Sequence, residues 1–297
     1  MEIVFLGTAA MIPTKDRNHT GILISHKKES VLLDCGEGIQ RQMKIAKVDI
    51  NRIRRICISH WHGDHVLGLP GLIQTMAAQN YEGTLYIYGP KGSKKYLEHM
   101  LKALVFDVAR INFDVKEVKE GSFYKGDEYT LSAYPLDHST PCIGFSFKEK
   151  DRRRLKVAQI KKLKLPEGPL LGKLQQGKDV TWDGQKIKAD DVSYVVKGKK
   201  IAYVADSTPC TRAVDLAKEA DIMICESTHK SGIEEKTEEY KHMTSKQAAQ
   251  LAHRAKAKKL ILTHFSQRYK EVDELLDEAK DIFPDVIGAF DFMKVKV

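Results

Sequence analysis

The 297-residue sequence lacks the features that mark membrane, secreted and repeat proteins. No stretch approaches the ~18 consecutive apolar residues that a membrane span needs, so no membrane association is predicted. There are only five cysteines and none forms a C-x-x-C pair, which argues against a disulfide scaffold or a cysteine zinc cluster. Reduced thiols instead favour a cytoplasmic protein. The first seven residues lack a basic region and a cleavage site, and we expect a strand there rather than a signal peptide.

The composition is that of a folded protein with an excess of positive charge. Hydrophobic residues make up 42% and charged residues 30% of the chain, which excludes a disordered class. The formal net charge is +9. Such an excess fits a polyanionic partner without specifying one, because net charge speaks only to solubility and non-specific attraction.

Short β-rich runs and helical stretches alternate in both halves of the chain. This pattern predicts an α/β fold with two sheets packed together and covered by helices, in a single domain over residues 1–297. The predicted strands are 2–7, 20–25, 30–34, 54–59, 84–88, 129–136, 200–204, 221–225, 259–263 and 286–290. The predicted helices are 37–46, 93–106, 211–219, 245–257 and 269–282, and Thr244 with Gln247 is expected to cap the fourth of these.

One segment, residues 148–180, departs from this pattern. It carries eleven Lys or Arg against four acidic residues, so most of the net charge lies in it. It also contains Gly168-Pro169 and only scattered apolar residues. Two interpretations stay open: a solvated, flexible loop, or a basic arm that grips a phosphate backbone.

Three histidines and one aspartate lie within six residues, directly after the predicted strand 54–59. They are His60, His62, Asp64 and His65, in an H-x-H-x-D-H pattern. A tight turn after a strand lets His60 and His62 share one metal ion while Asp64 and His65 face another. Neutral imidazoles and a carboxylate are ligands that zinc or a similar divalent ion accepts. Four such residues at this spacing predict a metal site.

Six residues cannot complete two metal sites, so the rest of the chain must supply further ligands. Three candidates follow predicted strands, where loops carry function on a rigid scaffold: His138, Asp206 and His264. We expect Asp206 to bridge the two ions. One ion would take His60, His62 and His138, and the other Asp64, His65 and His264. The remaining histidines are interpreted as structural or surface residues: His19, His26, His99, His229 and His253.

The H-x-H-x-D-H motif, followed by the spaced His, Asp and His, resembles the metallo-β-lactamase superfamily. Within that superfamily the chain looks like the tRNase Z family, the endonucleases that mature tRNA 3′ ends, over nearly its whole length. The segments that carry the resemblance are Phe5-Leu6-Gly7-Thr8, the P-x-K-x-R-N loop Pro13–Asn18, the D-C-G-E-G segment Asp34–Gly38, His65–Leu72, and Leu262–Tyr269.

The resemblance implies an αββα sandwich of two mixed sheets flanked by helices, with an inserted flexible arm at 148–180. It implies a two-metal hydrolase that cleaves precursor tRNA after the discriminator nucleotide, leaving a tRNA 3′-hydroxyl and a 5′-phosphorylated trailer. The cofactor would be two zinc ions, with manganese or iron also accepted. Asp64 would position the attacking water, and His242, oriented by Glu226, would protonate the leaving oxygen. A homodimer is also implied.

The same resemblance assigns residues that would hold the RNA. Lys15, Arg17 and Asn18 in the P-x-K-x-R-N loop are expected near the acceptor end. In the basic segment, Gly168-Pro169 matches the family's flexible arm, which binds the tRNA elbow. We therefore expect Gly168, Pro169 and Lys173 to contact RNA, through shape and phosphates.

Four positions depart from the usual family pattern. Trp61 stands between the first two histidines, and Asp206 lies in Ala-Asp-Ser-Thr. Glu226 lies in Cys-Glu-Ser-Thr, and His242 lies in His-Met-Thr. Each change keeps the ligand or acid–base position, so only the fit of the substrate at these loops is affected.

Two alternatives stay open. A broad-specificity metal-dependent phosphodiesterase of the same fold would explain the altered loops. A non-catalytic RNA-binding relative would keep the fold and the arm, but such proteins usually lose metal ligands, and all seven are present here. The endoribonuclease is therefore the favoured hypothesis.

Overall fold

The protein is described by a computed structural model covering residues 1–105 and 107–297. The chain divides into two compact units. Unit 1 comprises Met1–Lys125, Leu131–Phe147 and Lys200–Val297, and unit 2 comprises Gly126–Thr130 and Lys148–Lys199. Each unit is described by itself.

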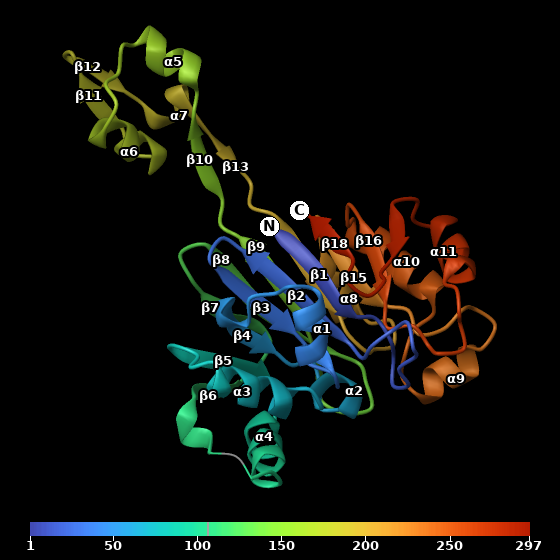
Figure 1. The fold of residues 1–297 in the computed structure, drawn as a ribbon. Helices are drawn as coiled ribbons and strands as arrows, with labels where there is room; N and C mark the ends of the chain where they lie inside the picture. The colour runs from blue at the N-terminus through green and yellow to red at the C-terminus, as the bar shows by residue number, and fades with distance from the viewer. Residues whose placement is uncertain (106) are drawn as a thin grey trace. The chain divides into compact units, whose positions relative to one another are not determined.

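The first sheet of unit 1 has seven strands in the order β18-β1-β2-β3-β4-β5-β6 (Figure 1). It is mixed, because β1 pairs antiparallel with β18 and β2, whereas β3 to β6 run parallel to one another. The strands are β1 Glu2–Gly7, β2 Gly21–His26, β3 Glu29–Leu33, β4 Ile53–Cys57, β5 Thr84–Gly89, β6 Asn112–Glu117 and β18 Lys294–Lys296.

The second sheet also has seven strands, in the order β17-β16-β15-β14-β9-β8-β7. Its strands β14 to β17 pair in parallel, and β15 and β16 are buried along their whole length, as is usual for strands covered on both faces. The strands are β7 Gly121–Lys125, β8 Tyr129–Leu136, β9 Cys142–Glu149, β14 Lys200–Val204, β15 Ile222–Glu226, β16 Leu260–Thr263 and β17 Val286–Gly288.

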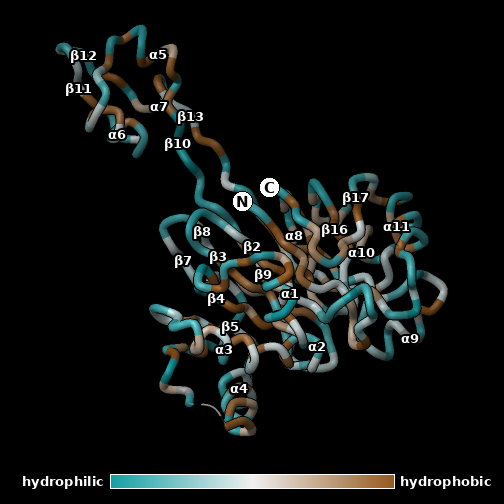
Figure 2. The backbone as a smooth tube through the Cα atoms, in the orientation of Figure 1, coloured by the Kyte–Doolittle hydropathy of each residue, from teal (hydrophilic) through white to brown (hydrophobic). Residues whose placement is uncertain are grey.

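The two sheets pack against each other and helices cover their outer faces. Between the sheets, the rings of Tyr88 and Phe123 lie 4.7 Å apart, and the Tyr203 hydroxyl donates to Asp34 over 2.7 Å. Hydrophobic residues gather along the central strands in Figure 2. The helices are α1 Ile39–Ile45, α2 Gly63–Val66, α3 Leu69–Ala78, α4 Ser93–Lys102, α8 Thr211–Ala217, α9 Glu234–Glu239, α10 Ser245–Ala255 and α11 Asp273–Lys280, with 3-10 turns at Ile50–Arg52 and Val108–Arg110.

The predicted αββα sandwich is confirmed, while some of its elements differ from the sequence pattern. Strands β6, β7 and β9 lie where the pattern predicts none. The predicted helix 93–106 ends at Lys102, and Phe106 lies outside the described residues. The predicted capping box at α10 is present, because Thr244 accepts from the Gln247 backbone N–H and Gln247 accepts from that of Thr244.

Unit 2 contains helices and strands. One of the two interpretations of its sequence is a solvated loop, and the structure is more ordered than that. Its elements are β10 Arg152–Leu155, α5 Val157–Lys162, α6 Pro169–Gln175, β11 Val180–Trp182, β12 Gln185–Ile187, α7 Ala189–Val192 and β13 Ser193–Val196. Two antiparallel pairs form, β10 with β13 and β11 with β12. Its own small core buries Leu165, Leu174, Val180, Ile187, Ala189 and Val192.

The extent of unit 2 differs from the segment predicted at 148–180. It continues to Lys199, because β12, α7 and β13 complete the structure that β10 begins. Several of the residues that close its core therefore lie beyond Val180. A charge count marks the basic part of the insertion but not this later part, in which acids and bases are nearly balanced.

Candidate active site and metal centre

The candidate site lies where strands of both sheets end. Asp34 follows β3, the H-x-H-x-D-H segment follows β4, and His138 follows β8. Asp206 and His264 follow β14 and β16. The carboxyl ends of neighbouring parallel strands meet at one edge of a sheet, so residues distant in sequence converge there. His264 has a left-handed backbone (φ 61°), which turns the chain directly after β16.

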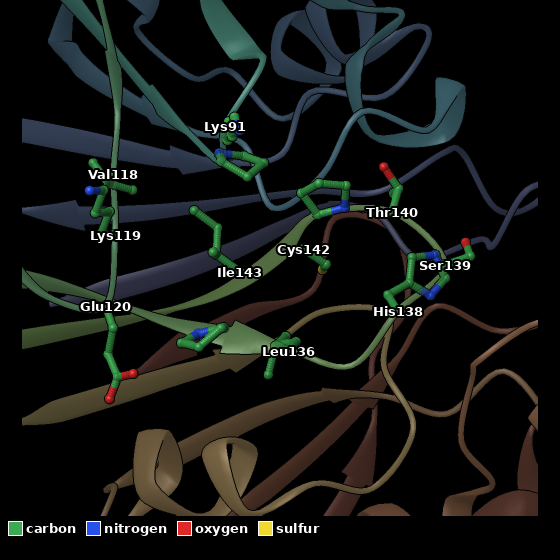
Figure 3. Close-up of a pocket in the computed structure, with 13 residues that line it drawn as sticks. Lys91, Val118, Lys119, Glu120, Leu136, His138, Ser139, Thr140, Cys142 and Ile143 are labelled. Carbon is green, nitrogen blue, oxygen red and sulfur yellow. The ribbon is translucent and has the colours of Figure 1, made fainter.

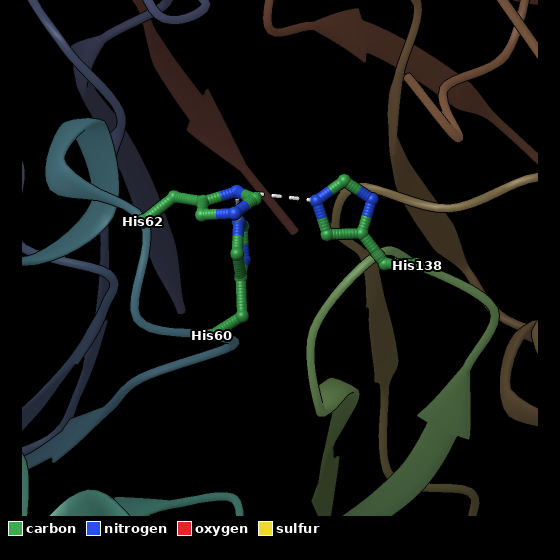
Figure 4. A group of neighbouring side chains, drawn as sticks. All are labelled: His60, His62 and His138. Carbon is green, nitrogen blue, oxygen red and sulfur yellow. Dashed lines mark hydrogen bonds between the residues drawn. The ribbon is translucent and has the colours of Figure 1, made fainter. Parts of the chain in front are cut away.

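The first cluster consists of His60, His62 and His138 (Figure 4). The His62 Nδ1 lies 3.1 Å from the His60 Nε2 and 3.2 Å from the His138 Nε2. Burial lowers the pKa of His60, with a further contribution from the neighbouring ring of His65. This shift favours the neutral ring, the form that can bind a metal ion.

The second cluster consists of Asp64, His65, Asp206 and His264, all of them buried. The His264 Nε2 lies 3.3 Å from the His65 Nε2, 3.3 Å from the Asp64 Oδ2 and 3.4 Å from the Asp206 Oδ1. Burial raises the pKa of Asp64, but the ring of His65 and a hydrogen bond from His264 outweigh it and keep the pKa below its ordinary value. Asp64 is therefore ionised.

Asp206 joins the two clusters. Its Oδ2 lies 3.6 Å from the His60 Nε2 in the first cluster and 3.4 Å from the His65 Nε2 in the second. A carboxylate can use both oxygens as ligands, so this position suits the bridging role expected from the sequence. The structure thus brings all seven predicted ligands together.

The donor geometry fits divalent ions. Two ligands at ~2.0–2.1 Å from a tetrahedral ion lie roughly 3.3 Å apart, close to the spacings within both clusters. The Oδ1 atoms of Asp64 and Asp206 are buried and have no hydrogen-bond partner within residues 1–105 and 107–297. A buried carboxylate oxygen without a partner is costly, and a bound cation would remove that cost.

Asp34 anchors one side of the site through a set of short hydrogen bonds. Its Oδ2 lies 2.8 Å from the His65 Nδ1 and accepts from the hydroxyls of Ser59 and Tyr203 over 2.8 and 2.7 Å. Its Oδ1 accepts from the Ser59 backbone N–H over 2.7 Å. The Ser59 hydroxyl also lies 3.0 Å from the His60 Nδ1. These bonds orient the rings of His60 and His65 toward the cluster.

The rings of His138 and His264 are contacted by residues in the loops of the second sheet. The His138 Nδ1–H donates to the Lys241 carbonyl over 2.9 Å, and Lys241 also forms a 2.7 Å ion pair with Asp137. The His264 Nδ1 lies 3.0 Å from the Thr228 hydroxyl. Asp34 opens the D-C-G-E-G segment, but the motif pattern assigned neither it nor Ser59 or Thr228 a role in the site, because the partners of these residues come from elsewhere in the fold.

His242 lies at the rim of the second cluster, two residues before the Thr244 cap of α10. Its Nδ1 is 3.1 Å from the Glu226 Oε1 and 3.8 Å from the Asp206 Oδ2. Glu226, the buried last residue of β15, also accepts from the Ser207 backbone N–H over 2.8 Å. The predicted pair is therefore in contact, with Glu226 fixed by the loop that carries Asp206.

The charges around His242 favour its protonated ring. Burial lowers the pKa of His242, but the carboxylates of Glu226 and Asp206 outweigh burial and raise the pKa to about 9. A protonated imidazole beside a hydrolytic centre can donate a proton to a leaving oxygen. Glu226 therefore both contacts the His242 ring and contributes to its raised pKa.

His229, interpreted from the sequence as structural or surface, instead lines the same cavity. This cavity has a volume of about 570 Å³ and is also lined by His62, His138 and His242. The His229 ring is buried and its centroid lies 6.4 Å from that of His242. No motif signalled this position, because His229 reaches the cavity only through the turn after β15.

The P-x-K-x-R-N loop is tied to the body of unit 1. Arg17 is buried and donates to the Tyr269 carbonyl. The Asn18 backbone N–H donates to Asp291 over 2.8 Å, and its side-chain amide donates to the Glu37 carbonyl over 2.7 Å. Both side chains therefore brace the loop.

Lys15 is the one predicted residue of this loop whose side chain is open to solvent, with 90% of it exposed. Its ammonium lies 3.9 Å from the Asp16 carboxylate, a distance at which an exposed ion pair contributes little. The Lys15 charge is therefore accessible to a ligand.

The predicted RNA-contacting residues of unit 2 lie at helix α6. Gly168 precedes the helix with φ 126°, a conformation that favours glycine, and Pro169 begins it. Gly168, Pro169 and Lys173 are all exposed.

The departures from the family pattern have local partners. Cys225 and Met243, in two of the altered loops, are buried with their sulfur atoms 3.8 Å apart. Trp61 donates its indole N–H to the Ser93 hydroxyl over 2.8 Å and lies 5.5 Å from the Tyr96 ring. The altered side chains therefore have partners of their own in unit 1.

Comparisons with known proteins agree with this geometry. Residues 1–155 match the family described as Anti-Pycsar protein Apyc1, and residues 174–265 match the beta-lactamase superfamily domain. Among solved structures, the metallo-beta-lactamase fold protein YhfI from Bacillus subtilis superposes with a TM-score of 0.72 at 18% identity, over 99% of this chain and 98% of that one. The fold and the site together define a metallo-β-lactamase-fold hydrolase.

Relatives that align along the whole chain define the family. Ribonuclease Z of Methanothermobacter thermautotrophicus is 40% identical over 100% of this chain and 97% of its own. Ribonuclease BN of Cronobacter sakazakii is 39% identical over the full length of both. The crystal structure of human tRNase Z, short form, has a TM-score of 0.71 at 26% identity, covering 100% of this chain and 99% of that one. The chain belongs to the ribonuclease Z family of metal-dependent endoribonucleases.

Among the residues that the structure describes, every helix is too short or too polar to cross a bilayer.

Proposed function

We propose that this endoribonuclease removes the 3′ trailer of precursor tRNA by a single cut after the discriminator nucleotide, using two zinc ions. One observation carries the proposal: in a chain of the ribonuclease Z family, seven candidate ligand side chains lie together with the His242–Glu226 pair, beside a cavity that His242 and several of the ligands line. A phosphodiester is anionic and resists attack, and such a centre addresses both obstacles.

The two clusters are the proposed metal sites. His60, His62 and His138 would hold one ion, and Asp64, His65 and His264 the other, with Asp206 between them. When bound, the ions would supply Lewis-acid stabilisation of the phosphate and a water of lowered pKa. Zinc suits this mixture of imidazole and carboxylate ligands, and manganese or iron would also be accepted.

Asp64 and His242 would act on different protons of the reaction. Asp64, ionised and beside both His65 and His264, would accept a hydrogen bond from the attacking water and orient it toward phosphorus. His242 would donate its proton to the departing tRNA 3′-oxygen, with Glu226 holding the Nδ1 side of the ring. The products would be a tRNA 3′-hydroxyl and a trailer with a 5′-phosphate.

Two regions would select tRNA. Lys15 presents an accessible charge on a loop that Arg17 and Asn18 brace, so we propose that Lys15 contacts the acceptor end while the other two residues position it. The basic unit 2, including Gly168, Pro169 and Lys173, would bind the tRNA elbow through phosphates, a mode of recognition common for structured RNA.

The enzyme is further proposed to be a cytoplasmic homodimer. All five cysteines are free thiols, four of them buried, which suits a reducing compartment. Light scattering would test the assembly: a mass near 33.6 kDa would exclude the dimer, and about twice that value would support it.

The first experiment is cleavage of a 5′-labelled precursor tRNA carrying a 3′ trailer, with and without added zinc. A single zinc-dependent cut after the discriminator nucleotide, leaving a 3′-hydroxyl, would support the proposal. His62→Ala should abolish the cut but retain RNA binding, while His99→Ala on α4 serves as a matched control. Hydrolysis of a simple phosphodiester without any cut in the precursor would instead indicate a broad phosphodiesterase.

A further inference from the structure

A second depression, of about 480 Å³, shares His138 and Ser139 with the cavity that holds His242 and is otherwise lined by different residues. Its walls come from three places in unit 1: the turn after β5, the β6–β7 connection, and the β8–β9 connection. Figure 3 shows His138 and Ser139 at one end, Lys119 and Glu120 at the other, and Ile143 between them. The volume lies within the range of small-ligand pockets.

The base of this depression is apolar. Leu136 and Ile143 form part of its lining with almost completely buried side chains, and Val118 is half-buried at its wall. Pro135 and Pro141 add exposed rings at the edge. A shallow apolar surface of this kind suits a flat, unpaired ring system, such as a nucleobase.

The rim carries positive charge. Lys91 and Lys119 are exposed, and neither forms an ion pair within the described part of the chain. The one acidic residue in the lining, Glu120, is already paired with Arg212 at 3.0 Å. Lysines that have no acidic partner attract an anion, and phosphate is the anion that accompanies a nucleobase.

The chemistry of the cut indicates which side of the scissile bond faces the depression. This step rests on the proposed function. His242 donates to the departing tRNA 3′-oxygen, so the discriminator nucleotide belongs in the cavity that His242 lines. Phosphorus stays with the trailer, whose first nucleotide must leave the centre by another route. His138 and Ser139 line both hollows, so the second begins beside His138, one of the candidate metal ligands.

We propose that this depression, lined by Val118, Leu136 and Ile143 with Lys91 and Lys119 at its rim, binds the first nucleotide of the 3′ trailer. The base packs on the apolar residues, and the lysines contact the phosphates that follow it. The enzyme thereby recognises both sides of the scissile bond, and part of its selectivity lies on the product that is discarded.

The base contact is tested with two precursors, one carrying a normal first trailer nucleotide and one abasic at that position. The wild-type enzyme should lose about tenfold in kcat/KM on the abasic precursor, a loss typical of one unstacked base. Val118→Asp should cut both precursors equally slowly, because the apolar contact is already gone. The proposal would be overturned if the wild-type enzyme had the same kcat/KM on both precursors. It would also be overturned if Val118→Asp still lost as much kcat/KM on the abasic precursor as the wild-type enzyme.

The phosphate contact is tested with Lys91→Ala/Lys119→Ala, in which only exposed side chains change. KM for a precursor with a trailer of several nucleotides should rise, and the rise should shrink when the trailer is cut to one nucleotide. Lys44→Ala/Lys95→Ala, two exposed helix lysines outside the depression, removes the same charge as a control. Equal effects of the two double variants would refute a trailer-specific contact.

The same assays separate this inference from the proposed function. If the wild-type enzyme makes no cut in the normal precursor, the proposed function fails. If it cuts that precursor correctly but treats the abasic and normal trailers alike, only the trailer subsite fails.

Discussion

At the residue scale, the orientation of the candidate ligands depends on side chains that do not themselves face the cluster. Asp34 is fully buried, and its two oxygens contact His65, Ser59 and Tyr203. Its backbone is left-handed (φ 57°), a conformation that Asp and Asn tolerate better than most residues. Geometry therefore accounts for an aspartate at this position.

Asp34→Asn tests this role in metal binding. The substitution preserves the size and the tolerated backbone but removes the charge that fixes the His65 ring. We expect zinc affinity to fall about 10–100-fold, the usual cost of losing such a supporting group. Competition with a chromophoric chelator would measure it. Asp49→Asn, a cap of a surface 3-10 turn, should bind zinc as the wild type does, and an unchanged affinity in Asp34→Asn would contradict the prediction.

The His242–Glu226 contact predicts a specific pH dependence. The raised pKa of His242 keeps its ring protonated at neutral pH, so activity should fall as the pH rises through the pKa and the proton donor is lost. Glu226→Gln removes the nearest carboxylate, which lowers that pKa and should move the alkaline limb of kcat/KM to lower pH. Profiles that superpose would show that Glu226 does not act through His242, and Glu98→Gln on α4 is the control.

At the scale of elements, the P-x-K-x-R-N loop separates substrate contact from support. Asp291 accepts hydrogen bonds from the Asn18 backbone, the Thr8 hydroxyl and the Gln42 amide, all between 2.8 and 2.9 Å. This single carboxylate joins the loop to α1 and to the C-terminal segment. Lys15, by contrast, forms its one ion pair within the described residues with the adjacent Asp16.

A substitution that removes support from the loop should affect stability, whereas a substitution of the substrate-contacting residue should affect KM. Asp291→Ala should lower the free energy of unfolding by about 2–3 kcal/mol, because three donors that are buried or partly buried lose their acceptor. Lys15→Glu should leave stability unchanged and raise KM for precursor tRNA. Denaturant unfolding and steady-state cleavage measure the two effects. A Lys15→Glu enzyme with unaltered KM would show that the loop does not contact RNA.

The sequence predicts elements and motifs at this scale better than it predicts contacts. The H-x-H-x-D-H pattern and the strand-ending His138, Asp206 and His264 are visible because ligand chemistry needs particular residue types. The burial of Arg17 is not, since a basic turn looks the same whether its arginine faces solvent or a carbonyl. His229 is likewise hidden, because its place in the cavity depends on how two loops fold together.

At the scale of the whole molecule, the chain combines a hydrolase body with a small basic unit that has its own core. That core was not apparent in the sequence because its apolar residues are few and spread over short elements. Leu174 and Val180 meet Ile187 and Val192 only when β11, β12 and α7 fold together. The charge of the sequence therefore predicts the basic surface of unit 2, but it does not predict the small core that supports that surface.

The contribution of unit 2 is tested by charge reversal in the full chain. Lys161→Glu/Lys162→Glu/Lys164→Glu changes three exposed residues at and just after α5. We expect kcat/KM for precursor tRNA to fall about tenfold or more and its salt dependence to weaken by roughly one per lost phosphate contact. Hydrolysis of a small phosphodiester should not change. Equal losses on both substrates would argue against RNA binding by unit 2, and Lys44→Glu/Lys95→Glu is the control.

The pairing of β1 with β18 and the position of His264 bear on the synthesis of the protein. The first strand finds one of its partners only among the last residues of the chain, and one candidate metal ligand lies 33 residues before the end. The ribosome synthesises a chain from its N-terminus to its C-terminus. A nascent polypeptide therefore contains His60 and His62 long before it contains His264. Cleavage activity is therefore expected only after β16 and His264 have been synthesised and folded.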